Sequence, residues 1–347
     1  MSSVLPESGK ICGMILKRPV VFFLVALVVA SCAAQPVAPV STETPEPTAT
    51  ATSIPTATPT PAKAILVMTD DPALQPLREL MSRLAAESEL QLEQRTDVQI
   101  GDVLPEWKVV VFATPPANLS ELVNAAPGTQ FLTFSSVELY QAPNLSVISS
   151  RADWQAFVAG YLTTLVAFDW RTAAFLPSDL PESAVMSDAF RNGQYYFCGR
   201  CSTYYAPYAG FPLIVSLPVA SSAEEWKLAA SPVQQNYAYG IYVAPQAASA
   251  DFLSYLATFN TTLLGGQTPP SEILPKWAVT LQFNTLASLE RLWAELVAGK
   301  GGKTVSAEFW LTDVNPALLT PGRQILVEKV IQELQEGSIS PLSPPLE

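Results

Sequence analysis

The stretch KAILVMTDDPALQPLRELMSRLAAE, residues 63–87, decides the fold. It begins with a continuous apolar run over residues 64–68, which has the length of a buried strand. Leucine and methionine then recur at helical spacing, at Leu74, Leu77, Leu80, Met81 and Leu84. An apolar run followed by a 3.6-residue period predicts a strand and then an amphipathic helix.

The same alternation of strand and helix continues along the chain. We expect further strands at about 109–112, 130–134, 172–176, 213–217, 239–243, 277–283 and 305–311. We expect helices at about 118–125, 153–168, 182–195, 223–234, 248–259, 286–297 and 321–334. Strands that are apolar on both faces and alternate with helices indicate parallel sheets covered on both sides, the α/β class. So many units exceed one sheet and predict two lobes that face each other across a cleft.

The residues before this globular part predict a secretory signal. Lys17 and Arg18 precede an apolar segment, residues 19–29, that is too short to span a bilayer comfortably. Residues 29–32, Val-Ala-Ser-Cys, resemble the lipobox of bacterial lipoproteins, which implies lipidation of Cys32 and removal of residues 1–31. The alternative is a cleaved signal followed by an incidental cysteine. Translation starts at Met1 or at Met14.

Residues 33–62 predict an extended stalk, because proline recurs there and bulky apolar residues are nearly absent. In a polyproline II conformation the stalk would reach roughly 90 Å at about 3.1 Å per residue. Residues 342–347 form a short tail. With several acyl chains on Cys32, we expect a lipid-anchored, extracytoplasmic protein in the cell membrane or an outer membrane.

The composition of the chain argues against several classes of function. The chain carries 19 Lys and Arg against 31 Asp and Glu, a formal charge of −12, which disfavours nucleic acid as a partner. Without residues 1–31 the balance is 16 against 30, or −14. The absence of histidine excludes His-based catalysis and His-rich metal sites. No phosphate-binding glycine loop or nucleophile motif is present, so we expect neither an enzyme nor a cofactor.

The segment YYFCGRCSTYYAPYAGFP, residues 195–212, is the most unusual of the globular part. For Cys198 and Cys201 we expect a structural disulfide, the default outside the cytoplasm. A zinc site would need two more ligands, and a redox pair would need to open a helix after a strand. The tyrosines of the segment, Tyr204 and Tyr205 among them, form either an aromatic wall or lid over a ligand or a packed surface loop.

Four stretches resemble the basic membrane lipoprotein family of ABC-transporter substrate-binding proteins. They are RADWQAFVAGYLTTLVA at 151–167, SDAFRNG at 187–193, SSAEEWKLA at 221–229 and VNPALLTPGRQILVEKVIQELQEGSISP at 314–341. The resemblance implies the type I periplasmic-binding fold, two Rossmann-like lobes joined by a hinge. We place lobe 1 at about 63–150 and 284–320, and lobe 2 at about 151–283. It also implies a monomer that delivers a small-molecule ligand, often a purine nucleoside, to an ABC permease in the membrane.

The expected ligand-binding residues stand at strand ends, where ligands bind in open α/β sheets. They are Asp70, Asp71, Thr114, Ser135, Ser136, Arg151, Tyr204 and Tyr205. Arg151 matches the family's arginine ahead of an acidic helix start, although Ser150 replaces the family's aromatic residue. Asp70 and Asp71 either accept hydrogen bonds from ligand hydroxyls or cap a helix. The alternative function is a surface sensor or scaffold that keeps the binding-protein fold.

Overall fold

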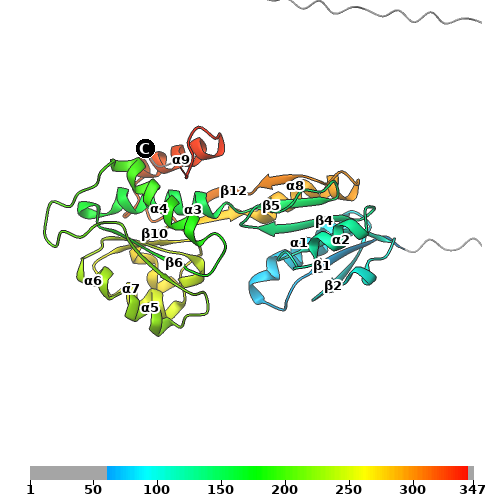
Figure 1. The fold of residues 1–347 in the computed structure, drawn as a ribbon, viewed down its shortest axis with the longest axis horizontal. Helices are drawn as coiled ribbons and strands as arrows, with labels where there is room; N and C mark the ends of the chain where they lie inside the picture. Colours follow the sequence, from blue (N-terminus) through cyan, green and yellow to red (C-terminus); the bar gives the residue numbers. More distant parts are fainter. Residues whose placement is uncertain (1–60, 343–347) are drawn as a thin grey trace, which may run out of the picture. The chain divides into compact units, whose positions relative to one another are not determined.

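The computed structural model describes residues 61–342, which fold into two six-stranded sheets within one compact unit of the chain. The expected signal peptide, Cys32, almost all of the stalk and the end of the tail lie outside the described residues. Helices cover both faces of each sheet (Figure 1). The expected α/β class with two sheets is therefore confirmed.

The first sheet has the strand order β11-β5-β4-β3-β1-β2, and all its pairs are parallel. Its strands are β1 (Lys63–Val67), β2 (Gln91–Arg95), β3 (Trp107–Phe112), β4 (Gln130–Ser135), β5 (Leu145–Ser149) and β11 (Thr304–Ser306). Helices α1 (Gln75–Glu87) and α8 (Thr285–Val297) pack on one face, and α2 (Leu119–Ala125) packs on the other. Along β1, Leu66 faces α1 and α8 whereas Ile65 faces α2, so both faces are buried.

The second sheet has the order β12-β10-β9-β8-β6-β7 and is parallel except for the β10–β12 pair. Its strands are β6 (Thr172–Pro177), β7 (Leu213–Leu217), β8 (Gly240–Val243), β9 (Thr262–Gly265), β10 (Trp277–Asn284) and β12 (Glu308–Thr312). Helices α3 (Ala152–Val166), α4 (Ser183–Cys198) and α9 (Pro321–Gln335) cover one face. Helices α5 (Ala223–Ala229), α6 (Ser231–Gln235) and α7 (Ala250–Leu256) cover the other.

Short 3-10 turns complete the described part: η1 (Pro72–Leu74), η2 (Ile100–Asp102), η3 (Phe168–Trp170), η4 (Pro245–Ala247) and η5 (Ser271–Lys276). The helix expected over 223–234 is two helices, because Pro232 has no N–H to continue the first one. Among residues 61–342, no helix combines the length and the apolar character needed to cross a membrane.

The strand expected over 305–311 is also two strands, and they belong to different sheets. β11 pairs with β5 in the first sheet, whereas β12 pairs antiparallel with β10 in the second. Phe309 packs against Phe283 of β10, with ring centroids 4.7 Å apart. The expected assignment of 284–320 to lobe 1 is therefore corrected from residue 308 onward. The chain passes between the sheets at three places: from β5 to α3, from β10 to α8 and from β11 to β12.

Helices α3 and α4 approach each other closely because both carry a glycine at their contact. A Cβ atom on Gly160 would overlap the carbonyl oxygen of Phe190, and one on Gly193 would overlap that of Phe157. Twelve residues of α3, from Asp153 to Thr164, are buried as a result of this packing and of the sheet beneath. Glycine at these two positions therefore sets the distance between the helices that follow β5 and β6.

We expect Gly160→Ala to lower the free energy of unfolding by about 3 kcal/mol, because the added methyl group must push two helix backbones apart. Gly322→Ala is the matched control. Gly322 lies exposed in the first turn of α9 with no atom near the position of a Cβ, and alanine favours the helix. Urea unfolding followed by circular dichroism measures both changes. Equal stability of the two variants would contradict the close contact between α3 and α4 at Gly160.

Candidate functional site

Polar residues from both sheets meet at the carboxyl ends of the parallel strands. A cavity of about 300 Å³ lies there, and its lining includes Ser135 at the end of β4, Ser136 after it, Glu182 before α4 and Gln246 after β8. An adjoining cavity of about 590 Å³ shares Ser136 and Glu182 and adds Arg151. The structure therefore brings together three of the residues predicted from the sequence.

The two serines have different roles. The Ser135 hydroxyl donates to the carbonyl of Val137 (2.8 Å) and accepts from the Val137 N–H (3.2 Å), which fixes the turn after β4. The Ser136 hydroxyl instead donates to Oε1 of Glu182 (2.8 Å). This bond joins a loop of the first sheet to a loop of the second. Ser136 and Glu182 are both only partly buried, so a ligand can reach them.

Arg151 stands where the chain passes from β5 into α3, and its charge is already paired. Its Nε and Nη2 donate to the two carboxylate oxygens of Asp153 at 2.9 and 2.6 Å. Its guanidinium also lies over the Trp154 ring, 4.8 Å from the centroid. The hydrogen bonds to Asp153 raise the pKa of Arg151 above its usual value. The pair lines the cavity with polar groups whose formal charges cancel.

Three residues of this site were not among the ligand-binding residues predicted from the sequence: Gln155, Glu182 and Gln246. Gln155 is buried in α3, and its Nε2 donates to the Leu281 carbonyl (2.7 Å). Glu182 stands directly before α4, where the sequence favours a capping role, but in the structure its side chain caps no N–H group of the helix. Gln246 lies in the proline-containing turn η4, which follows β8. No sequence signal distinguishes these residues from ordinary polar ones.

Asp70, Asp71 and Thr114 follow β1 and β3. They lie on the side of the first sheet where its parallel strands end, which we call the carboxyl edge, and all three are exposed. Asp71 caps η1, since its Oδ1 accepts from the Ala73 N–H (2.9 Å), and Asp70 pairs with Arg78 (3.2 Å). Asp71 therefore acts as a cap, whereas Asp70 forms an exposed ion pair and caps no helix. An apolar cavity of about 290 Å³ lies beside them, and its lining includes Leu74, Leu77, Ala113, Phe134 and Leu286.

Tyr204 and Tyr205 lie elsewhere. The structure separates them from Ser135, Ser136 and Arg151, because their loop is bound to residues that precede β6 at the amino edge of the second sheet. Arg171 donates to the Tyr205 carbonyl, and Asp169 accepts from the Tyr204 N–H (2.6 Å). The expectation that these tyrosines share a site with the serines is therefore corrected.

Asp169 and Arg171 form an almost fully buried ion pair, with Nε and Oδ2 3.2 Å apart and side chains 1% and 3% exposed. Arg171 also donates to the Asn236 carbonyl (3.0 Å). Burial raises the pKa of Asp169, but the N–H groups of Tyr204 and Tyr205 and the Arg171 guanidinium outweigh it and lower that pKa below its usual value. The pair anchors the loop between α4 and β7, residues 199–212, which we call the tyrosine loop.

Cys198 and Cys201 stand where α4 ends and this loop begins. The structure records them as a disulfide, with Cα atoms 5.6 Å apart, within the usual range for such a bond. Gly199, between them, has a φ of +65°, which glycine adopts without strain. Among the described residues, no group of three carboxylates or cysteines is placed to hold a metal ion.

We expect Asp169→Asn to lower the free energy of unfolding at pH 7 by about 3 kcal/mol, because it leaves the Arg171 charge buried without its counter-ion. The wild-type pair contributes fully above the unfolded aspartate pKa of about 3.9 and loses its contribution as pH falls through the lower folded pKa. The difference between the two proteins should thus shrink as the pH falls below about 3.9.

Urea unfolding at pH 7 and pH 3 measures this difference. Asp188→Asn, at an exposed position of α4, is the control and should leave stability nearly unchanged at both pH values. A difference between wild type and Asp169→Asn that stays constant with pH would contradict the assignment.

No protein-family model and no curated protein matches this sequence. Solved structures with a similar fold include an ABC transporter solute-binding protein from Conexibacter woesei, with TM-score 0.58 and 15% identity over 81% of this chain and 98% of that one. A transcriptional activator of the comK gene from Bacillus halodurans gives 0.61 and 9%, over 81% and 100%. A carbohydrate transporter solute-binding protein from Agrobacterium radiobacter, solved with D-arabinose, gives 0.50 and 10%, over 77% and 99%. At such identities the likeness establishes the fold, which is that of periplasmic binding proteins.

Proposed function

We propose that this protein is the extracytoplasmic solute-binding lipoprotein of an ABC importer and captures a small polar ligand between its two lobes. The observation that carries the proposal is the convergence of Ser136, Glu182 and Gln246 on one cavity, from loops of both sheets. Ligands of open α/β sheets bind at this carboxyl edge. Residues contributed by both lobes are what a ligand needs if it is to hold the lobes together.

Lobe closure by a hinge motion is the second part of the proposal. The three passages of the chain between the sheets supply short connections that such a hinge would use. The bond between Ser136 and Glu182 crosses from one lobe to the other without a ligand. A ligand hydroxyl that donates to Glu182 would take the place of the serine and keep the link.

The chemistry of the cavity disfavours an anion and suits a neutral, hydroxylated ligand that donates to Glu182. Arg151 is neutralised by Asp153, so the wall offers no excess positive charge to an anion. Glu182 accepts hydrogen bonds, and Gln246 can donate and accept them. The ligand of the Agrobacterium radiobacter protein, D-arabinose, has this neutral, hydroxyl-rich character.

A nucleoside-like ligand fits the neighbourhood best. Phe134 lines both the polar cavity with Glu182 and the apolar cavity with Leu74 and Leu286. A ribose would occupy the polar side, where its hydroxyls meet serine and glutamate. A flat base would pack against Phe134 on the apolar side. Nucleosides join these two chemistries in one small molecule, whereas a free sugar uses the polar side alone.

A thermal-shift screen of nucleosides, bases, sugars and amino acids tests the ligand class. A ligand at about 100 times its dissociation constant should stabilise the protein by about 2.7 kcal/mol and raise its melting temperature by a few degrees. We expect the shift with nucleosides. A melting-temperature shift with sugars alone would support the polar cavity as the ligand site and contradict the proposed packing of a base against Phe134.

Glu182→Gln should then weaken binding of the identified ligand about tenfold to a hundredfold, because a hydrogen bond to a charged group contributes about 1.5–3 kcal/mol. Isothermal titration calorimetry measures the change. Glu121→Gln, on the exposed side of α2, is the control and should bind as wild type does. A well-folded protein that responds to nothing in the panel would instead favour the sensor or scaffold.

Anchoring is proposed from the sequence, since Cys32 lies outside the described residues. We expect Cys32→Ser to move the protein from the membrane fraction to the soluble fraction, because the thioether-linked lipid can no longer form. Immunoblots of fractionated cells measure the distribution. Cys12→Ser, in the segment that is expected to be removed, is the control and should leave the protein in the membrane. Release of both variants alike would contradict the assignment to Cys32.

A further inference from the structure

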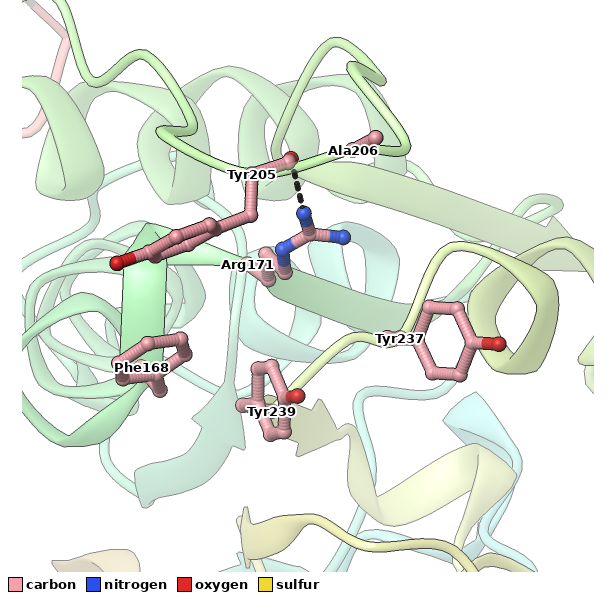
Figure 2. Close-up of a pocket in the computed structure, with 6 residues that line it drawn as sticks. All are labelled: Phe168, Arg171, Tyr205, Ala206, Tyr237 and Tyr239. Atoms are coloured by element: carbon pink, nitrogen blue, oxygen red, sulfur yellow. Dashed lines mark hydrogen bonds between the residues drawn. The ribbon is translucent and has the colours of Figure 1, made fainter.

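A separate cavity, of about 380 Å³, lies at the amino edge of the second sheet, the edge opposite the proposed ligand site. Its aromatic lining comes from three segments: Phe168 of η3, Tyr205 of the tyrosine loop, and Tyr237 and Tyr239 before β8. Figure 2 shows these rings around the Arg171 guanidinium. Phe168 and Tyr205 stack with centroids 6.0 Å apart, and Tyr239 meets Phe168 edge-on at 5.6 Å.

Three of these four rings are largely exposed to solvent. Phe168, Tyr205 and Tyr237 are each about three-fifths exposed, and Tyr204 and Tyr208 on the same loop are more exposed still. Large apolar side chains gathered on a surface mark interaction sites, because the fold forgoes the favourable free energy of burying them.

The backbone beneath the rings is strained. Asp169, Trp170 and Tyr237 have φ values of +55°, +53° and +53°, a region that bulky residues such as Trp and Tyr rarely adopt. Such conformations persist only where surrounding contacts hold them, and they cluster at ligand-binding sites. Here the buried Asp169–Arg171 pair supplies those contacts by binding the tyrosine loop and the Asn236 carbonyl. The cavity is thus preorganised at the expense of local strain.

The charges of the site favour a neutral ligand. The Arg171 guanidinium donates to the Asp169 carboxylate and to two backbone carbonyls, so its charge is balanced within the protein. An anion would meet an acidic protein of formal charge −12, and a cation would lie beside the guanidinium. The same acidity opposes docking on an anionic membrane surface.

We propose that this amino-edge cavity binds a neutral polysaccharide chain. A sugar ring has a face of C–H groups that packs on an aromatic ring, and a rim of hydroxyls that hydrogen-bonds with tyrosine hydroxyls. The stacked Phe168 and Tyr205 rings offer the first of these surfaces, and the hydroxyls of Tyr205, Tyr237 and Tyr239 offer the second. Tyr204 and Tyr208 extend the aromatic surface along the loop, which suits a chain longer than one ring. The site would hold the protein against surface glycans while the carboxyl-edge cavity remains available.

Native affinity electrophoresis of the full chain tests this proposal, with gels that contain hydroxyethylcellulose, xylan or galactomannan. We expect retardation by at least one polymer, and at least tenfold weaker apparent affinity for Phe168→Ala and Tyr205→Ala. Trp310→Ala, which removes an exposed aromatic side chain of β12, is the matched control and should be retarded as wild type is.

Tyr237→Gly separates binding from folding. It removes a ring of the cavity and also relieves the positive φ, so it should weaken retardation while the melting temperature holds or rises. Glu182→Gln alters only the carboxyl-edge cavity and should leave retardation by the polysaccharide unchanged. The proposed ligand site and the proposed polysaccharide site are therefore tested independently.

Three outcomes would overturn the proposal. Wild-type protein could migrate unretarded in every gel, or the Phe168 and Tyr205 variants could be retarded like the wild type. The protein could also bind phosphatidylglycerol vesicles through these same rings and ignore the polysaccharides.

Discussion

Parallel pairing is the constraint on which the rest of this structure depends. In each sheet it places every parallel strand's carboxyl end at one edge and every amino end at the other. Residues such as Ser136 and Glu182 are therefore brought together although 46 positions separate them in the chain. Because helices cover both faces of the sheets, the two edges are where loops remain accessible and where sites can form.

The two edges of the second sheet differ in chemistry. At the carboxyl edge the accessible groups are polar, with Glu182 and Gln246 around a cavity and Arg151 neutralised by Asp153. At the amino edge they are aromatic, and a buried ion pair beneath them holds their backbone. In both places an arginine is paired with an aspartate two residues away, so neither arginine contributes an excess positive charge. The Glu182 carboxylate leaves the carboxyl-edge site acidic, because its hydrogen-bond partner is the neutral Ser136.

Much of the fold was predictable because buried parallel strands and amphipathic helices leave strong periodic patterns. β1, β3 and β6 are almost entirely buried and were predicted within two residues of their bounds. β2 was missed because it is an edge strand with four polar residues out of five. β9 was missed because it has four residues and ends in glycine. The passage at Ala307 left no periodic signal, since one residue suffices to move the chain from one sheet to the other.

The sequence by itself determined the α/β class, two lobes, an acidic composition without histidine, and a serine pair at the end of an expected strand. These follow from composition and from contacts between residues close in sequence. Only the tertiary structure decided that Glu182 joins Ser136 and that Tyr205 lies at the opposite edge. Those placements depend on strand order and on a buried ion pair, which are interactions between distant residues and leave no periodic mark in the chain.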